Sequence, residues 1–231
     1  MPRIVKDPEE RRQELLDAAE KLFGTKGYAK TAVSDIVKEV GVSQGTFYYY
    51  FKSKDEIADA VIDRAIDQGL AVFKKIAHDD SLPAYRKALL MIAHDLYGFD
   101  HEQSMGSLFP HIHHEENAFL HQKMMIRSIK AFAPIFGQIV EQGKREGSFR
   151  TDKDALLAAE FLVTGYQFWL DASVFQWNRE ELRLRRAAIG GFIETVLGAE
   201  PGSFDLSLLK NEYEKFRQTG SWASMASRSA D

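Results

Sequence analysis

With 231 residues and an apolar fraction of 45%, the chain is long enough for one large folded domain or two smaller ones. It contains no cysteine, so disulfides, thiolate zinc sites and a cysteine nucleophile are excluded. The formal net charge of −4 argues against a protein that coats nucleic acid with its whole surface, although it allows a local basic patch. The N-terminal residues are charged where a signal peptide needs an apolar segment, and no apolar run is long enough to cross a bilayer. We therefore expect a cytoplasmic protein that does not associate with a membrane.

The first helix signal lies within ten residues of the start. Asp7 is a capping residue type, and Pro8 fits the first helical position. Apolar residues then recur at helical spacing over residues 15–23. Gly24 and Gly27 predict the end of this helix, because glycine adopts the left-handed conformation at low cost.

Two short helices are predicted next. One covers about residues 32–40, with Thr31 as its cap, and it ends at Gly41. The other is capped by Ser43 and reaches about Tyr50.

Helical patterning continues over the rest of the chain, while strand alternation is scarce. We expect helices at about 53–77, 81–96, 117–147, 152–172, 178–197 and 203–217, with an irregular helical stretch at 102–114 and a kink at Pro134. The small polar residues of 218–231 predict a disordered tail. The fold is thus predicted to be all-α, with an N-terminal three-helix domain at 1–53 and a larger helical domain at 54–217.

The two short helices predicted at about 32–40 and 43–50 carry the most informative residues. Two short helices separated by a three-residue turn that contains glycine have the geometry of a helix-turn-helix. Phe47 and Phe51 lie one helical turn apart and can face the core, which leaves a tyrosine-rich helix with little charge on the surface. Such a helix suits a DNA groove, where phenol rings pack on sugars and hydroxyls bond phosphates. Gln44 is a residue type that reads base edges, and Gly45 allows close backbone approach. The alternative is a helical hairpin whose aromatic residues fill its own small core.

Local charge favours the same interpretation. Residues 25–54 contain five lysines against two acidic residues, inside a chain that is acidic as a whole. A segment of this kind is the candidate for contact with phosphates.

Four motifs follow one another in the N-terminal quarter of the chain: AAxxLF at 18–23, GY at 27–28, TxxxxIV at 31–37 and GVSQGTFYYYFKSK at 41–54. Through these motifs, residues 11–56 resemble the DNA-binding domain of the TetR family of transcriptional regulators. This resemblance implies that Thr31 bonds a phosphate, that four residues face the major groove, and that three meet the DNA backbone. The groove residues are Ser43, Gln44, Gly45 and Thr46, and the backbone residues are Tyr48, Tyr49 and Lys54.

The same resemblance implies that the C-terminal region binds a small-molecule effector and joins two subunits. The residues support pairing independently, since 155–170 is apolar nearly all round, which exceeds what one buried face requires. A second apolar stripe lies within 189–196, beside Gly190 and Gly191, which allow close helix approach. The candidate dimer residues are Leu162, Phe168, Ile189, Phe192, Ile193 and Val196. The alternative is a monomer in which both helices are internal.

Large soft side chains are numerous enough to line an apolar cavity, which predicts an apolar or aromatic effector. The candidate pocket residues are Phe99, Met105, Phe109, His114, Met124, Met125, Phe132, Tyr166 and Trp169. Taken singly, each of these residues is more typical of the protein core than of a ligand contact.

Five of the seven histidines lie between residues 101 and 121. On a helix, His114 and His121 share a face two turns apart, and His111 and Glu115 are four residues apart, a pattern that suits zinc or nickel. Against this, a proline interrupts the segment and the HExxH motif is absent. We expect no metal and no cofactor, with a metal-responsive sensor or a metal-dependent enzyme as the alternative.

Motifs of catalysis do not occur: the chain has no Walker loop, no GxSxG elbow and no dinucleotide fingerprint. We therefore expect a regulator and not an enzyme. Its partners would be a palindromic double-stranded operator, a second copy of the chain and an effector whose binding releases the DNA. Sequence does not distinguish such a repressor from an activator.

Overall fold

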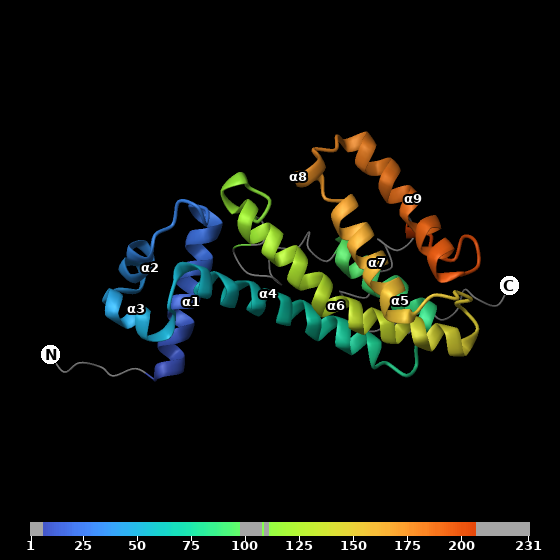
Figure 1. Cartoon of the computed structure of the whole chain (residues 1–231), viewed down its shortest axis with the longest axis horizontal. Helices are drawn as coiled ribbons and strands as arrows, with labels where there is room; N and C mark the ends of the chain where they lie inside the picture. The colour runs from blue at the N-terminus through green and yellow to red at the C-terminus, as the bar shows by residue number, and fades with distance from the viewer. Residues whose placement is uncertain (1–6, 98–107, 109–110, 207–231) are drawn as a thin grey trace. The chain divides into compact units, whose positions relative to one another are not determined.

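The computed structural model describes residues 7–97, 108 and 111–206 (Figure 1). Over these residues the chain forms helices and no strand, so the predicted all-α fold is confirmed. The helices are α1 (Pro8–Thr25), α2 (Val33–Val40), α3 (Gln44–Tyr50), α4 (Lys54–Ala77), α5 (Ala84–Tyr97), the 3₁₀ turn η3 (Glu115–Asn117), α6 (Ala118–Glu146), α7 (Ala155–Trp169), α8 (Ala172–Phe175) and α9 (Arg179–Leu197). Among these helices, none has the length and apolar character to cross a membrane.

Most predicted helix ends agree with the structure. The side chain of Asp7 accepts a hydrogen bond from the Glu9 amide at 2.8 Å and caps α1, with Pro8 in the first position. Ser43 caps α3 in the same way, and Asn178 caps α9. Most of the stretch predicted at 102–114 and most of the helix predicted at 203–217 lie outside the described residues, as does the tail at 218–231.

The cap of α2 differs from the prediction. Thr31 does not cap this helix, because its hydroxyl donates to the Gly27 carbonyl at 2.7 Å. The cap is Ala32, and its backbone N–H donates to the Asp35 carboxylate at 2.8 Å. A carboxylate in the first turn therefore stabilises the start of α2 where the sequence suggested a hydroxyl.

The chain packs as two compact units whose boundaries fall inside α4 and α6. Unit 1 comprises residues 1–69 and 102–128, and unit 2 comprises 70–101 and 129–231. The start of α6 belongs with the N-terminal helices because its side chains bond to α4: Lys123 pairs with Asp59 at 2.8 Å and Arg127 with Asp63 at 2.7 Å. These units are defined by packing. The boundary at residue 53 between a DNA-binding domain and an effector-binding domain concerns function, and it remains a prediction.

The core of unit 1 orients its three N-terminal helices. Phe23 of α1, Ile36 of α2 and Phe47 of α3 are fully buried, and Phe51 is almost so. The rings of Phe47 and Phe51 lie 5.9 Å apart, as expected for residues one helical turn apart on a buried face. The two phenylalanines predicted to face the core do so.

The core of unit 2 contains a buried carboxyl group. Asp95 of α5 is 8% exposed and accepts hydrogen bonds from the amide of Gln167 and the hydroxyl of Tyr166, both on α7. Burial raises the pKa of Asp95 to about 6, while the two donors act in the opposite direction. These bonds join α5 to α7.

Helix α9 approaches a later part of its own chain closely at Gly190. A Cβ at this position would lie 2.1 Å from the carbonyl oxygen of Phe204, a backbone atom. The next residue, Gly191, has no heavy atom within 4 Å of the corresponding point. Within one chain, Gly190 therefore approaches the backbone closely and Gly191 does not, while the close approach of helices expected at a dimer interface stays a prediction.

This contrast predicts opposite outcomes for two neighbouring substitutions. Gly190→Ala forces the turn at Phe204 away from α9, and we expect the melting temperature to fall by several degrees. Gly191→Ala, the matched control, adds a methyl group in open space within a helix, and we expect equal or slightly higher stability. Thermal unfolding followed by circular dichroism measures both, and equal melting temperatures would contradict the packing described at Phe204.

Candidate nucleic-acid interface

The face of α3 opposite Phe47 is presented to solvent. Gln44 and Gly45, in the first turn, are exposed. Tyr48 is 54% exposed and Tyr49 78% exposed, which is unusual for large aromatic side chains. The two tyrosines are therefore free to meet another molecule.

The first turn of α3 is held rigid by its cap. The hydroxyl of Ser43 accepts from the Thr46 amide at 3.2 Å and lies 3.0 Å from the Thr46 hydroxyl. Both side chains thus have local partners, while Ser43 itself remains exposed. Of the four residues expected in the groove, Ser43, Gln44 and Gly45 are exposed and Thr46 is half-buried.

The basic patch is smaller than the sequence suggested, because three of its five lysines have partners within unit 1. Lys26 pairs with Asp35 at 2.5 Å and Lys30 with Glu116 at 2.7 Å. The ammonium of Lys54 donates to the Tyr28 carbonyl at 2.9 Å. Pairing with a carboxylate offsets the charge that Lys26 and Lys30 would present to phosphates.

Thr31 is placed differently from the other candidate DNA residues. It is 2% exposed, and its hydroxyl points to the backbone of the α1–α2 loop (residues 26–32). Its role as a phosphate ligand remains a prediction, and this burial argues against it.

Tyr28 is a structural residue to which sequence reasoning assigned no role. Its hydroxyl donates to the Asp55 carboxylate. The Lys54 ammonium lies over its ring, 4.2 Å from the ring centroid, in a cation–π contact. Burial, with a smaller contribution from Asp55, raises the pKa of this phenol well above its usual value. Tyr28 thereby attaches the α1–α2 loop to the first turn of α4. The GY pair at 27–28 is one of the motifs that resemble the TetR family, but its spacing does not indicate Asp55 as a partner.

The candidate effector residues fall in both units. In unit 2, Phe132 is buried and stacks on Phe73 with centroids 4.6 Å apart, and Tyr166 is buried beside Asp95. Trp169 is half-buried in the same unit. In unit 1, Met124 is buried, Met125 half-buried and His114 exposed. The other three candidates, Phe99, Met105 and Phe109, lie outside the described residues. The pocket therefore remains a prediction.

The candidate dimer residues separate into a buried and an exposed group. Three are buried inside unit 2 (Leu162, Ile189 and Ile193), Val196 is half-buried, and Phe168 and Phe192 are 44% and 55% exposed. The structure adds exposed apolar residues that were not among the candidates, chiefly Leu157 at 62%, Phe161 at 67% and Leu184 at 53%.

These exposed side chains belong to two helices that pack on each other, α7 and α9 (Figure 1). A groove of about 630 Å³ lies between the start of α7 and the end of α9. It is lined by residues that include Leu157, Phe161 and Val196. An apolar patch that extends along two adjacent helices is typical of an interaction surface.

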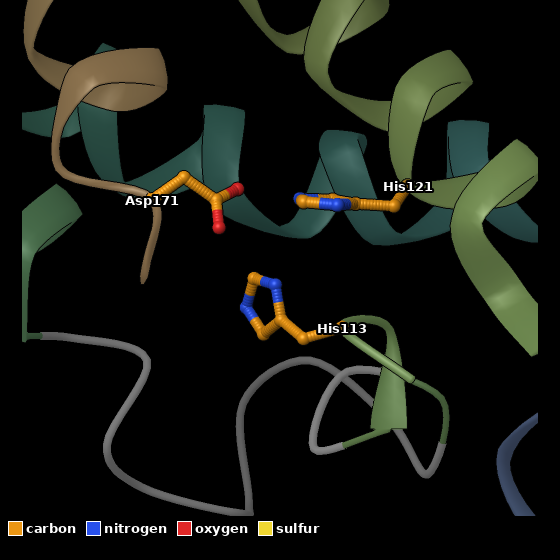
Figure 2. Close-up of side chains that lie close together, drawn as sticks. All are labelled: His113, His121 and Asp171. Atoms are coloured by element: carbon orange, nitrogen blue, oxygen red, sulfur yellow. The ribbon is translucent and has the colours of Figure 1, made fainter. Parts of the chain in front are cut away.

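The histidines of unit 1 form pairs other than those expected from helical spacing. The rings of His113 and His121 lie 4.7 Å apart, with ligand atoms within 4.8 Å (Figure 2). Those of His111 and His114 lie 5.1 Å apart. The expected His114–His121 pair does not form, because residues 111–117 make turns and a 3₁₀ helix where a continuous helix was assumed. Asp171, also labelled in Figure 2, belongs to unit 2 and caps α8.

Comparison with known proteins agrees with these features. Residues 15–61 match the family model described as "Bacterial regulatory proteins, tetR family", and residues 103–192 match "Tetracyclin repressor-like, C-terminal domain". Helices α1–α3 define a helix-turn-helix regulator of transcription. The chain belongs to the TetR family.

Individual relatives support the same assignment. The repressor KstR2 of Mycobacterium tuberculosis is 28% identical over 70% of this chain and 80% of its own length. The uncharacterized regulator YfiR of Bacillus subtilis is 37% identical over 35% of this chain, a match that spans only 40% of YfiR. SmeT, the repressor of the Stenotrophomonas maltophilia efflux pump SmeDEF, superposes with a TM-score of 0.63 over 86% of this chain and 95% of SmeT. At 17% sequence identity, this superposition shows a shared fold and no more.

The exposure of Tyr49 predicts a selective loss of DNA binding. Replacement of Tyr49 by alanine removes a side chain that is 78% solvated, so we expect the melting temperature to stay within about 1 °C of wild type. If the phenol meets the DNA backbone, affinity for a random-sequence duplex at low salt falls about tenfold. Tyr49→Phe keeps the ring and removes the hydroxyl, so it separates the contribution of the hydroxyl to DNA affinity from that of the ring. Fluorescence anisotropy reports the affinity, and unchanged binding by Tyr49→Ala would remove this residue from the interface.

Proposed function

We propose that the protein is a homodimeric repressor that binds a palindromic double-stranded operator through α3 and is released by a small effector. The observation that carries this proposal is the outward face of α3, which combines Gln44 with two exposed tyrosines on a helix whose other face is fixed in the core. Gln44 has the amide geometry that reads adenine in the major groove, and Gly45 lets the backbone approach the bases. Tyr48 and Tyr49 would meet sugars and phosphates.

Repression is favoured over activation by the relatives. KstR2, which aligns over 70% of this chain, is named a repressor, and so is SmeT. A repressor needs only to occupy DNA, whereas an activator must also contact the transcription machinery. Transcription from a template that carries the bound sequence, with and without the protein, distinguishes the two.

The exposed apolar residues of α7 and α9 support a homodimer. Leu157, Phe161 and Phe192 are each more than half exposed, on helices of the same unit. A second copy is the occupant that matches a palindromic target, because a two-fold dimer presents two identical α3 helices to two half-sites.

The effector is proposed to bind within the C-terminal helical region and to be apolar or aromatic. Buried aromatic residues such as Phe132 and Tyr166 support an apolar environment there. A shift of α4 would change the separation of the two α3 helices and lower DNA affinity. The coupling is reciprocal, so operator DNA would weaken effector binding by the same factor.

A metal-responsive regulator is the second candidate, and the approach of His113 and His121 is the observation in its favour. Two imidazoles supply only part of the three or four protein ligands that zinc takes, so we retain the organic effector as the proposal. Elemental analysis after dialysis against zinc or nickel decides between them. One equivalent retained by the wild type and lost in His121→Ala would establish the metal.

The DNA-binding role of unit 1 predicts a change in salt dependence. Lys54 lies at the start of α4, and its bond to the Tyr28 carbonyl uses one of the three N–H donors of its ammonium. If it also meets a phosphate, Lys54→Ala lowers the slope of log affinity against log salt by about one. Lys130→Ala, an exposed lysine of α6 in unit 2, is the matched control and should leave the slope unchanged. Equal slopes for all three proteins would remove Lys54 from the phosphate contacts.

If α7 and α9 form the dimer interface, a charge introduced there should produce a monomer. Leu157→Glu places a charge in the centre of the proposed interface, and we expect the mass in sedimentation experiments to fall to that of one chain. Ile126→Glu, on α6 of unit 1 and 48% exposed, is the matched control and should leave the mass unchanged. A dimer that persists in Leu157→Glu would place the interface elsewhere.

A further inference from the structure

Asn117 has every side-chain hydrogen-bonding group engaged, although it lies far in sequence from most of its partners. It is 1% exposed and ends the 3₁₀ turn that precedes α6. Its amide oxygen accepts from the backbone N–H of Tyr28 at 2.7 Å. Its amide nitrogen donates to the carbonyls of Phe23 and His111, both at 3.0 Å.

The bond to Phe23 satisfies a helix end. Phe23 lies in the last turn of α1, where carbonyl groups lack partners within the helix. Asn117 supplies this partner from 94 residues further along the chain. An amide is suited to the task because it donates and accepts at the same site, which a carboxylate of the same shape does not.

Glu116 adds a second set of contacts next to Asn117. Its carbonyl accepts from the Ala29 amide at 3.0 Å, and its carboxylate pairs with Lys30. The backbones approach so closely that a Cβ on Gly27 would lie 2.4 Å from the Cβ of Glu116. Gly27 also has a φ of +88°, which favours glycine. We call these contacts of Glu116 and Asn117 with residues 23–30 the clasp.

The loop held by the clasp also supports the DNA-binding helices. Thr31, which precedes α2, donates from its hydroxyl to Gly27 and from its amide to the Tyr28 carbonyl at 3.2 Å. The same carbonyl accepts from Lys54, and the Tyr28 hydroxyl bonds Asp55, both at the start of α4. The clasp therefore bonds directly to the loop that fixes where α2 and α4 begin.

We propose that Asn117 is a positioning residue for DNA binding: it holds the α1–α2 loop against the start of α6, and DNA affinity falls when this attachment opens. The inference rests on the proposed function of α3 as the DNA-reading helix. It extends the DNA-binding machinery beyond residues 1–53 to a segment that contacts no base. A change in the turn at 111–117 then alters DNA affinity without touching the recognition surface.

The test compares full-length variants on a DNA duplex that the wild-type protein selects from a random pool. We expect Asn117→Ala to bind this duplex about tenfold more weakly than wild type. Asn117→Asp keeps the shape and the acceptor but loses both N–H donors, and it should weaken binding as well. In the absence of DNA, the amides of Tyr28 and Ala29 should exchange with solvent faster in both variants.

A matched control separates positioning from a general loss of stability. Lys87 of unit 2 is equally buried, at 2% exposed, and donates to Ala77 and Gln142. Lys87→Met should lower the melting temperature but leave DNA affinity within about twofold of wild type. A loss of affinity in Lys87→Met equal to that in Asn117→Ala would overturn the proposal.

Chemical cross-linking provides a rescue. The chain has no cysteine, so a short bifunctional thiol-reactive reagent joins only cysteines that are introduced. The variant Lys30→Cys/Glu116→Cys places them at two positions whose native side chains meet at 2.7 Å. When Asn117→Ala is added to this double-cysteine variant, cross-linking should restore its DNA affinity to that of the cross-linked double-cysteine variant with Asn117 intact. Failure to recover it, or full affinity of Asn117→Ala before cross-linking, would overturn the positioning role. If the wild-type protein selects no sequence from the pool, the proposed function itself fails.

Discussion

The inward packing of Phe47 is the constraint on which the DNA-binding surface depends. Phe47 is fully buried, and Phe51, one turn later, is 2% exposed. With these rings fixed in the core of unit 1, the seven-residue helix α3 has only one possible outward face. That face carries Gln44, Tyr48 and Tyr49. The apolar residues of α3 therefore decide where its polar residues point, and a rotation of the helix would bury tyrosine hydroxyls at the cost of exposing phenylalanine.

The core that orients α3 is completed by a distant part of the chain. The clasp and the ion pairs of Lys123 and Arg127 join η3 and the first third of α6 to α1, the α1–α2 loop and α4. As a result, the compact unit that contains the recognition helix is built from two segments separated by more than thirty residues. The turn that leads into α6 is thus bonded to the loop between α1 and α2.

Local features of this structure could be predicted from the sequence. Helix caps such as Asp7, Ser43 and Asn178 act on amides two or three residues away, so their residue types and spacing suffice. The same holds for Phe47 and Phe51, whose spacing alone places them on one face. Thr31 shows the limit of this reasoning, because a threonine before a helix indicates a cap, while its actual acceptor is the carbonyl of a loop glycine.

Features that depend on distant or ambiguous contacts could not be predicted. No local pattern connects Asn117 to Phe23 across 94 residues. Helix α7 is apolar nearly all round, so its sequence did not distinguish the buried face with Leu162 from the exposed face with Leu157 and Phe161. The histidine pairs depended on whether residues 111–117 form a helix, and a 3₁₀ turn there changed which rings meet.

The most direct measurement is selection of bound sequences from a random pool of duplex DNA by the full-length protein, followed by sequencing of the bound fraction. A dimer that presents two copies of α3 predicts an enriched palindrome whose half-sites are separated by about one helical turn, or by a multiple of it. The enriched bases should change when Gln44 is replaced by alanine, because this side chain is exposed at the start of α3. A pool that shows no enrichment, or an enriched sequence without two-fold symmetry, would contradict the assignment of α3 as the recognition helix of a symmetric regulator.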